Sequence, residues 1–255
     1  MIFYKGKFLS DEDFHIGPLN RALFFGENPF TSGVIFNKKV LGVEQHLDRL
    51  KKMTQFFYHQ EFDSFEKEIR KALTDFDSSE PHYFRITFFE NSDYFIFFKP
   101  HAFEEVELHA KLSSYPRGRS SLPSFVKLGN YTENFNELKE VKKDGFNEIV
   151  LIDFEGKILE CTTSNLLFVR EGVVHTPLIR EGILNGVTRS RLIRYLEEKS
   201  IPFVEDNFDH TLLESADEIW CTNAVKGLRP FSTFNQRNLK RDLFEKIQAE
   251  FCEYE

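Results

Sequence analysis

Apolar residues recur along the first half of the chain with the periods of helices and strands. One helix is predicted because apolar residues follow one another at steps of three and four: Phe62, Phe65, Ile69, Ala72, Leu73 and Phe76. Residues 44–58 predict another helix, and residues 30–36 predict a strand that ends at a turn from Asn37. Residues 83–89 and 93–98 predict a β-hairpin around Asn91 and Ser92.

The second half of the chain mixes short strands with helices. Helices are predicted over 134–144, 187–199 and 239–251, and strands over 149–152, 166–168, 173–175 and 218–221. Strands and helices do not alternate strictly along the chain. The predicted fold class is therefore α+β rather than a doubly wound parallel sheet.

A stretch rich in Ser, Pro and Gly, residues 113–123, interrupts these patterns. Such a composition predicts a domain boundary or an ordered active-site loop. We therefore expect a small α+β domain over 1–112, an interdomain loop over 113–124 and a larger α/β domain over 125–255.

Composition and charge exclude several classes of protein. The chain has 255 residues, of which 41% are apolar, 29% charged and 15% aromatic, so disordered and low-complexity classes do not fit. Its net charge of −8 argues against nucleic-acid binding, which normally needs a basic face. The longest aromatic run, residues 94–98, stops at Lys99, whereas a membrane-spanning helix needs about 20 apolar residues.

The cysteines and the N-terminal residues predict a reduced, cytoplasmic protein. Cys161, Cys221 and Cys252 are odd in number and far apart, so they predict neither a disulfide framework nor a zinc site. The scattered histidines predict no metal site. Residues 1–7 lack the charged and then apolar order of a secretory signal.

One local feature has a physical function of its own. Gly186 lies directly before the helix predicted from Val187. The first amides of a helix are unpaired and carry the positive end of the helix dipole, so this junction can hold a phosphate. Simple capping of the helix by Asn185 is the alternative.

Six segments, in order along the chain, resemble the fold-type IV pyridoxal-phosphate enzymes, which include branched-chain and D-amino-acid transaminases and 4-amino-4-deoxychorismate lyase. They are residues 21–31 (Arg-Ala-Leu-Phe-Phe-Gly-Glu-Asn-Pro-Phe-Thr), 46–50 (His-Leu-Asp-Arg-Leu), 127–131 (Lys-Leu-Gly-Asn-Tyr), 160–165 (Glu-Cys-Thr-Thr-Ser-Asn), 184–189 (Leu-Asn-Gly-Val-Thr-Arg) and 216–224 (Ala-Asp-Glu-Ile-Trp-Cys-Thr-Asn-Ala). Each alone is a weak signal, but their shared order is a strong one. The resemblance implies a two-domain fold similar to D-amino-acid aminotransferase, pyridoxal 5'-phosphate (PLP) between the domains, and a homodimer.

The same resemblance assigns roles to the cofactor residues. Lys127 would be the catalytic Schiff-base lysine, and Glu160 would keep the pyridine nitrogen protonated so that the ring can absorb carbanion charge. Arg49 would bind the cofactor phosphate, together with the amides of Val187 and Thr188.

The remaining expected site residues are assigned less directly. Asn223 and Ala224 match a second phosphate-side turn, and Tyr131 would point its hydroxyl toward the ring oxygen, or be a buried structural tyrosine. For the substrate, the candidates are Thr31, Arg117 and Arg119. The two arginines would pair with substrate carboxylates, or be solvated loop charges.

The sequence departs from the family pattern in three places. Glu27 and Asn28 replace the usual Asp-Gly, and Gly129 stands where a bulkier apolar residue is common. The helix over 136–143 lacks the usual Ala-rich stretch. These departures affect the expected substrate more than the expected cofactor.

The motifs leave the reaction open between two enzyme classes. Residues 30–32 and 221–224 are more similar to the lyase, which converts 4-amino-4-deoxychorismate to 4-aminobenzoate and pyruvate in folate biosynthesis. A transaminase of branched-chain or D-amino acids would use every one of the same cofactor residues. The third hypothesis is a non-catalytic relative that only binds a partner, and the presence of Lys127 argues against it.

Overall fold

The chain forms two compact units. The computed structural model describes residues 1–17, 20–89, 93–118, 120–180 and 182–254. The first unit comprises Met1–Glu104 and Phe125–Asn130, and the second comprises Glu105–Ser124 and Tyr131–Glu255. The boundaries therefore differ from those expected, because the segment that contains Lys127 belongs to the first unit.

Backbone pairing explains this difference. Pro29 and Leu128 form an antiparallel bridge, and the Phe30 N–H donates to the Lys127 carbonyl at 2.9 Å. The preceding loop instead pairs with the second unit, where the Ser113 N–H donates to the Val150 carbonyl at 2.8 Å. Such pairings between distant residues do not appear in the local periodicity.

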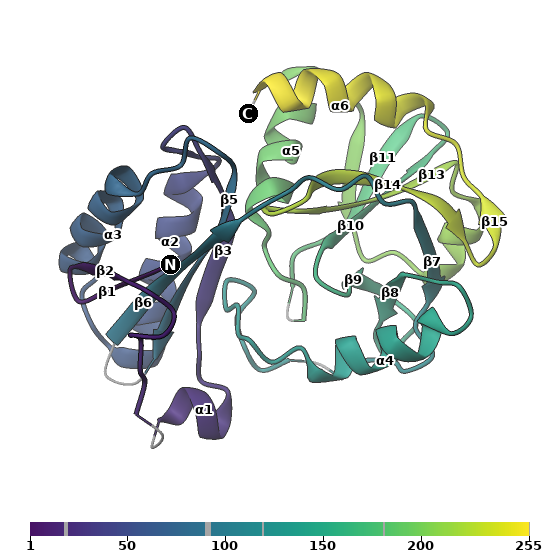
Figure 1. Cartoon of the computed structure of the whole chain (residues 1–255). Coiled ribbons are helices and arrows are strands. Elements are labelled where there is room, and N and C mark those ends of the chain that lie inside the picture. The colour runs from purple at the N-terminus through teal and green to yellow at the C-terminus, as the bar shows by residue number, and fades with distance from the viewer. Residues whose placement is uncertain (18–19, 90–92, 119, 181, 255) are drawn as a thin grey trace. The chain divides into compact units, whose positions relative to one another are not determined.

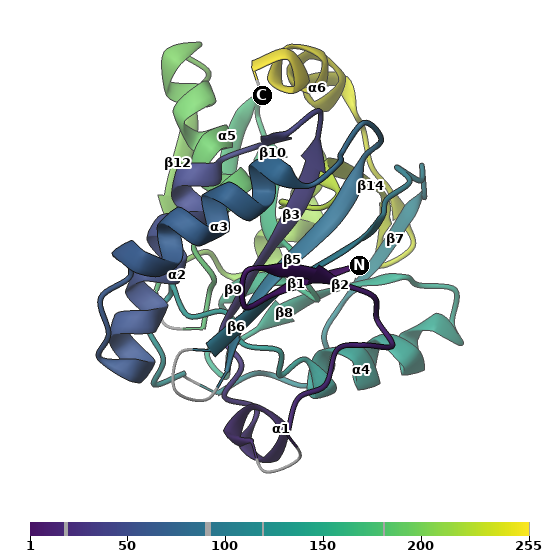
Figure 2. The same ribbon diagram turned by 60° about the vertical axis from the view of Figure 1, so that its left-hand side comes forward.

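The first unit is an antiparallel sheet with two helices packed against it (Figure 2). The strand order is β2-β1-β6-β5-β3-β4. Its elements are β1 (Ile2–Tyr4), β2 (Lys7–Leu9), α1 (Arg21–Phe25), β3 (Phe30–Phe36), β4 (Lys39–Val40), α2 (Val43–Tyr58), α3 (Asp63–Asp75), β5 (His82–Phe89) and β6 (Asp93–Pro100).

The apolar periodicity of the sequence produces this packing. Leu47, Leu50 and Met53 on α2 and Ile69 and Leu73 on α3 are buried in one core cluster with side chains of the sheet. Each buried aliphatic side chain of this size contributes about 1.5–3 kcal/mol of transfer free energy.

The second unit is built on a mixed, nine-stranded sheet (Figure 1). The strand order is β12-β11-β10-β13-β14-β7-β8-β9, and β15 pairs with β14. Its elements are β7 (Leu108–Leu112), α4 (Thr132–Lys142), β8 (Glu148–Ile152), β9 (Ile158–Cys161), β10 (Asn165–Arg170), β11 (Val173–Pro177), α5 (Val187–Glu198), β12 (Phe203–Asp206), the 3-10 helix η2 (His210–Ser215), β13 (Glu218–Asn223), β14 (Gly227–Phe234), β15 (Arg237–Asn238) and α6 (Asp242–Tyr254).

Both faces of the second sheet are buried. Along β10, Leu166 and Phe168 enter a core enclosed by the sheet, whereas Leu167 and Val169 pack under α5 and α6. A separate cluster joins α4 to β8 and β9 (Figure 1). Strands buried on both faces are continuously apolar, as β10 is.

The predicted fold class, α+β, is confirmed. The strand over 30–36 and the helices over 44–58 and 187–199 differ from the observed elements by at most one residue at either end. The hairpin is β5 and β6, although Asn91 and Ser92 lie outside the described residues. Among the described residues, no helix is both long and apolar enough to cross a membrane.

Candidate functional site

The segment with Lys127 lies along the beginning of β3 in the first unit. Lys127 is half-buried, and its backbone N–H points at the sulfur of Met53 at 3.4 Å. The Lys127 Nζ lies 4.8 Å from the centroid of the Phe30 ring. The predicted reactive amine is therefore held beside an aromatic face at the entry to β3.

A second cation faces the same ring. The Arg85 guanidinium carbon lies 3.6 Å from the Phe30 centroid, and Arg85 Nε donates to Thr87 Oγ1 at 3.0 Å. Sequence reasoning missed Arg85, because no motif includes it. The one available signal was a charged residue in the middle of an otherwise apolar and aromatic strand.

Arg49 lies on α2 and is 7% exposed. Helix α2 buries Leu47 and Leu50 on either side of it in the sequence. A guanidinium that is this deeply buried needs an anionic or hydrogen-bonding partner, as the expected phosphate role also requires.

Thr31, expected to contact substrate, has no exposed surface. Its Oγ1 lies 2.6 Å from Nδ1 of His46, which is also buried. The structure thus gives Thr31 a buried hydrogen bond within the first unit, and its substrate role stays a prediction.

In the second unit, Glu160 is held in a fixed orientation. Its Oε2 accepts hydrogen bonds from the Leu184 N–H at 3.1 Å and from Asn165 Nδ2 at 3.3 Å. The same Asn165 amide donates to the Leu184 carbonyl at 2.7 Å. These bonds join the motif of Glu160 and Asn165 to the loop that leads into α5.

The beginning of α5 has the features of an anion site. Gly186 is the residue before the helix, and no described side chain caps it. The Oδ1 of Asn185 accepts from Ser190 Oγ of the same helix at 2.9 Å. Val187 and Thr188 follow at the first helical positions and are both buried.

Only glycine fits at position 186. A β-carbon there would coincide with the Oδ1 atom of Asn165. The backbone φ of Gly186 is −68°, which any residue adopts. The glycine is therefore required by the close approach of Asn165 and not by its own backbone conformation.

Asn223 shapes the turn after β13. Its Oδ1 accepts from the amides of Val225 at 3.0 Å and Lys226 at 2.8 Å, and its Nδ2 donates to Ser164 Oγ at 2.9 Å. Ala224 lies inside this turn and is half-buried. The Asn223 side chain thus organises the backbone and places the turn beside the Ser164 segment.

Tyr131 is the half-buried residue before α4, and its ring centroid lies 5.9 Å from that of Phe135. Arg117 Nη2 donates to Glu137 at 3.0 Å, and the side chains are 17% and 4% exposed. The guanidinium is thus held in an ion pair of the second unit rather than presented as a solvated charge. Arg119 lies outside the described residues.

Neither described free cysteine is suited to be a nucleophile. Cys161 and Cys221 are completely buried. Burial raises the pKa of Cys221 to about 12, and burial followed by the charge of Glu148 raises the pKa of Cys161. Both remain thiols at neutral pH. Among the described residues, no group of three or more His, Cys, Asp or Glu could hold a metal ion.

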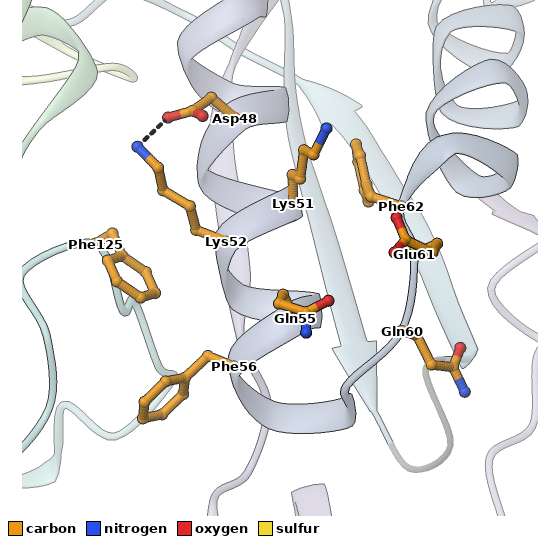
Figure 3. A pocket seen from close by; sticks show the side chains of 9 residues that line it. All are labelled: Asp48, Lys51, Lys52, Gln55, Phe56, Gln60, Glu61, Phe62 and Phe125. Atoms are coloured by element: carbon orange, nitrogen blue, oxygen red, sulfur yellow. Dashed lines mark hydrogen bonds and ion pairs between the residues drawn. The ribbon is translucent and has the colours of Figure 1, made fainter.

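A pocket of about 460 Å³ lies on the first unit, around α2 (Figure 3). Phe56 and Phe125 form part of its wall, and Lys52 pairs with Asp48 at 2.6 Å on its rim. None of the expected site residues lines this pocket. We therefore do not identify it with the candidate site.

Some of the expected residues have partners within their own unit. In the second unit, hydrogen bonds connect Glu160 through Asn165 to the segment that begins α5. In the first unit, Lys127 shares the Phe30 ring with Arg85. Within the second unit, a fixed carboxylate and the helix N-terminus after Gly186 are groups that suit a cofactor with a basic ring nitrogen and a phosphate.

Comparison with known proteins supports this assignment. A probable branched-chain-amino-acid aminotransferase of Rickettsia bellii is 23% identical over 94% of this chain and 89% of its own length. The structure of an aminotransferase from Brucella abortus bound to PLP has a TM-score of 0.89 at 23% identity, and the match covers 99% of this chain and 98% of that one.

The fold is shared with a lyase as well. A putative 4-amino-4-deoxychorismate lyase from Legionella pneumophila has a TM-score of 0.82 at 19% identity, over 96% of this chain and 97% of that one. Residues 29–234 match the family described as amino-transferase class IV. This match spans the lysine segment, the Glu160 motif and the beginning of α5, and the chain therefore belongs to the amino-transferase class IV family.

Proposed function

We propose that this protein is a PLP-dependent aminotransferase that acts on branched-chain amino acids. The lyase cues in residues 30–32 and 221–224 favour a different reaction, but the near-full-length relative from Rickettsia bellii carries the name of a probable branched-chain-amino-acid aminotransferase. A second relative, from Thermotoga maritima, carries the same name and is 25% identical over 93% of this chain.

The observation that carries this proposal is the pair of cations on Phe30. Lys127 Nζ lies 4.8 Å and the Arg85 guanidinium carbon 3.6 Å from the centroid of that ring. An α-amino acid carries its carboxylate on the carbon that bears its amino group. A guanidinium binds such a carboxylate in a fixed orientation, and the Arg85 guanidinium contacts the same ring as the Lys127 amine.

The residues present fit PLP. The amides of Val187 and Thr188 and the buried guanidinium of Arg49 would hold its phosphate. Glu160 would lie against its pyridine nitrogen, and Lys127 would bind its aldehyde carbon. Tyr131 would hydrogen-bond the ring oxygen.

The chemical roles of the side chains follow from this arrangement. When bound, PLP supplies a conjugated ring that absorbs the electron pair left on the α-carbon after it loses a proton. The Glu160 carboxylate, fixed by Leu184 and Asn165, keeps a proton on the pyridine nitrogen. Lys127 Nζ removes the proton from the α-carbon.

The second candidate function is the lyase. Its support is the Thr222-Asn223-Ala224 turn, which is more similar to the lyase pattern than to that of branched-chain enzymes, together with the fold shared with the Legionella protein. In that reaction Lys127 would remove the ring proton of 4-amino-4-deoxychorismate. Pyruvate would leave and 4-aminobenzoate would remain.

The deciding experiment compares both reactions in one preparation. Protein loaded with PLP is incubated with leucine, isoleucine or valine and 2-oxoglutarate, and glutamate is measured. A parallel sample receives 4-amino-4-deoxychorismate, and 4-aminobenzoate is measured. Glutamate formation that Lys127→Ala abolishes supports the aminotransferase, whereas release of 4-aminobenzoate alone supports the lyase.

Controls separate these outcomes from a non-catalytic relative. Lys51→Ala removes a lysine of the same unit that lines the surface pocket, and it should leave both reactions unchanged. A wild-type protein that takes up no PLP would favour a binding module. The family resemblance also leads us to propose a homodimer, which sedimentation velocity tests directly.

A further inference from the structure

Asn28 makes a side-chain contact with the backbone of the segment that carries Lys127. The Asn28 Oδ1 accepts a hydrogen bond from the Gly129 N–H at 2.7 Å, between residues 101 positions apart in the chain. On the other side of the Pro29–Leu128 bridge, the Phe30 N–H donates to the Lys127 carbonyl at 2.9 Å. The Pro29 carbonyl accepts from the Phe88 N–H at 2.9 Å, and the Gly129 N–H is paired by the side-chain oxygen of Asn28.

The same contact crowds position 129. A β-carbon on Gly129 would lie 3.0 Å from both Nδ2 and Oδ1 of Asn28, and 3.1 Å from Arg85 Nη2. Gly129 is exposed and its φ does not lie in the left-handed region, so its own backbone does not require glycine. The close approach of Asn28 and Arg85 is what disfavours a larger residue at this position.

The Asn28 carboxamide lies close to several groups of the candidate site. Oδ1 of Asn28 is fixed by the Gly129 N–H, which leaves Nδ2 as a donor near the Arg85 guanidinium. Arg85 in turn stacks on Phe30, the ring that Lys127 Nζ also contacts. A movement of Asn28 therefore reaches the backbone next to Lys127 through the Gly129 N–H.

We infer that Asn28 is a positioning residue for Lys127, and that Asn28 and Gly129 form a matched pair in which the asparagine requires the glycine. The inference rests on the proposed function in so far as Lys127 is the reactive amine. The contact itself does not depend on it. A single side-chain hydrogen bond contributes modestly to folding, whereas a displacement of about 1 Å at a reacting group can cost about 100-fold in rate.

A double-mutant cycle tests the pair. The variants are Asn28→Gly, Gly129→Ala and the double variant Asn28→Gly with Gly129→Ala. We expect Asn28→Gly to lower kcat about tenfold with little change in KM, and Gly129→Ala to lower it further because the new methyl group meets Asn28. The double variant should recover to within about threefold of Asn28→Gly, because removal of Asn28 clears the space.

Asn28→Asp provides the conservative comparison, because it keeps the acceptor for the Gly129 N–H. We expect it to keep most of the positioning effect. The pH midpoint of the visible absorption band of the lysine-bound cofactor should shift in Asn28→Gly and return toward the wild-type value in Asn28→Asp. A merely structural role would not move this midpoint.

Hydrogen exchange of the cofactor-free protein tests the contact without activity. The Gly129 amide should exchange about tenfold faster in Asn28→Gly, while the melting temperature stays within about 2 °C of the wild type. Equal exchange rates, or kcat losses that simply add in the double variant, would overturn the inference. Absence of transamination in the wild type would instead refute the proposed function, and the exchange result would still decide the contact.

Discussion

The carboxamide oxygen of Asn165 lies where a β-carbon on Gly186 would stand. Asn165 is 4% exposed and simultaneously donates to Glu160 and to the Leu184 carbonyl. The orientation of Glu160 and the beginning of α5 therefore depend on one close contact, through which a change at position 186 reaches the carboxylate.

We predict that Gly186→Ala weakens PLP binding at least tenfold. The added methyl group must displace Asn165, which breaks its bonds to Glu160 and Leu184 and shifts the amides at the start of α5. Fluorescence titration of the cofactor-free protein measures the affinity. Gly118→Ala is the matched control, since a β-carbon there meets only Phe154 at an ordinary 3.7 Å. Equal affinities would contradict the proposed phosphate site.

Arg49→Ala should also weaken PLP binding, by about 10- to 100-fold, because a hydrogen-bonded charge pair contributes about 1.5–3 kcal/mol. Arg70→Ala is the comparison, because Arg70 lies in the same unit but its ion pairs with Glu44 and Glu66 are at the surface. If both variants retain the cofactor equally well, Arg49 does not bind the phosphate.

Arg117→Ala should destabilise the protein rather than impair substrate binding. Glu137 is 4% exposed, and it also accepts from Ser113 Oγ at 2.8 Å. Removal of its cation leaves a buried carboxylate without its charge partner, at a cost of about 3 kcal/mol. Chemical denaturation measures this loss, and addition of Glu137→Gln should restore part of it. A raised KM with unchanged stability would instead support the role of Arg117 in substrate binding.

The buried position of His175 leads us to predict that the folded protein loses stability in mild acid. Its ring stacks on Phe168 at 4.9 Å and contacts Phe208 edge-on at 5.2 Å. Burial, and then the charge of Arg170, lower its pKa below the usual 6.5. The unfolded chain therefore binds the proton more readily, so the contribution of His175 to stability is complete above pH 6.5 and decreases as the pH falls through its folded pKa.

Melting temperatures at pH 7.5 and 5.5 test this prediction. The wild type should lose more stability between the two values than His175→Gln does, whereas His15→Gln, at an exposed position, should behave as the wild type. Identical losses in the wild type and His175→Gln would show that other groups control the acid response.

Much of the architecture follows from local patterns. Helices α2 and α3 repeat apolar residues at three- and four-residue steps, and β3 is bounded by a turn, so short-range periodicity was enough to predict them. The short strand β7 and the 3-10 helix η2 carry no such pattern, and the sequence did not predict them. Their structure depends on pairing with distant partners.

By itself, the sequence determined the strongly periodic elements, the order of the family motifs and the identity of Lys127, Glu160 and Arg49 as candidates. The tertiary structure decided which groups meet. It placed Lys127 with β3 and against the Phe30 ring that Arg85 also contacts, and it paired Arg117 with Glu137. The reason is physical. A helix or strand period describes which face of one element is apolar. A charge pair, or a segment that pairs with a distant strand, joins residues far apart in the chain, and no local pattern encodes such contacts.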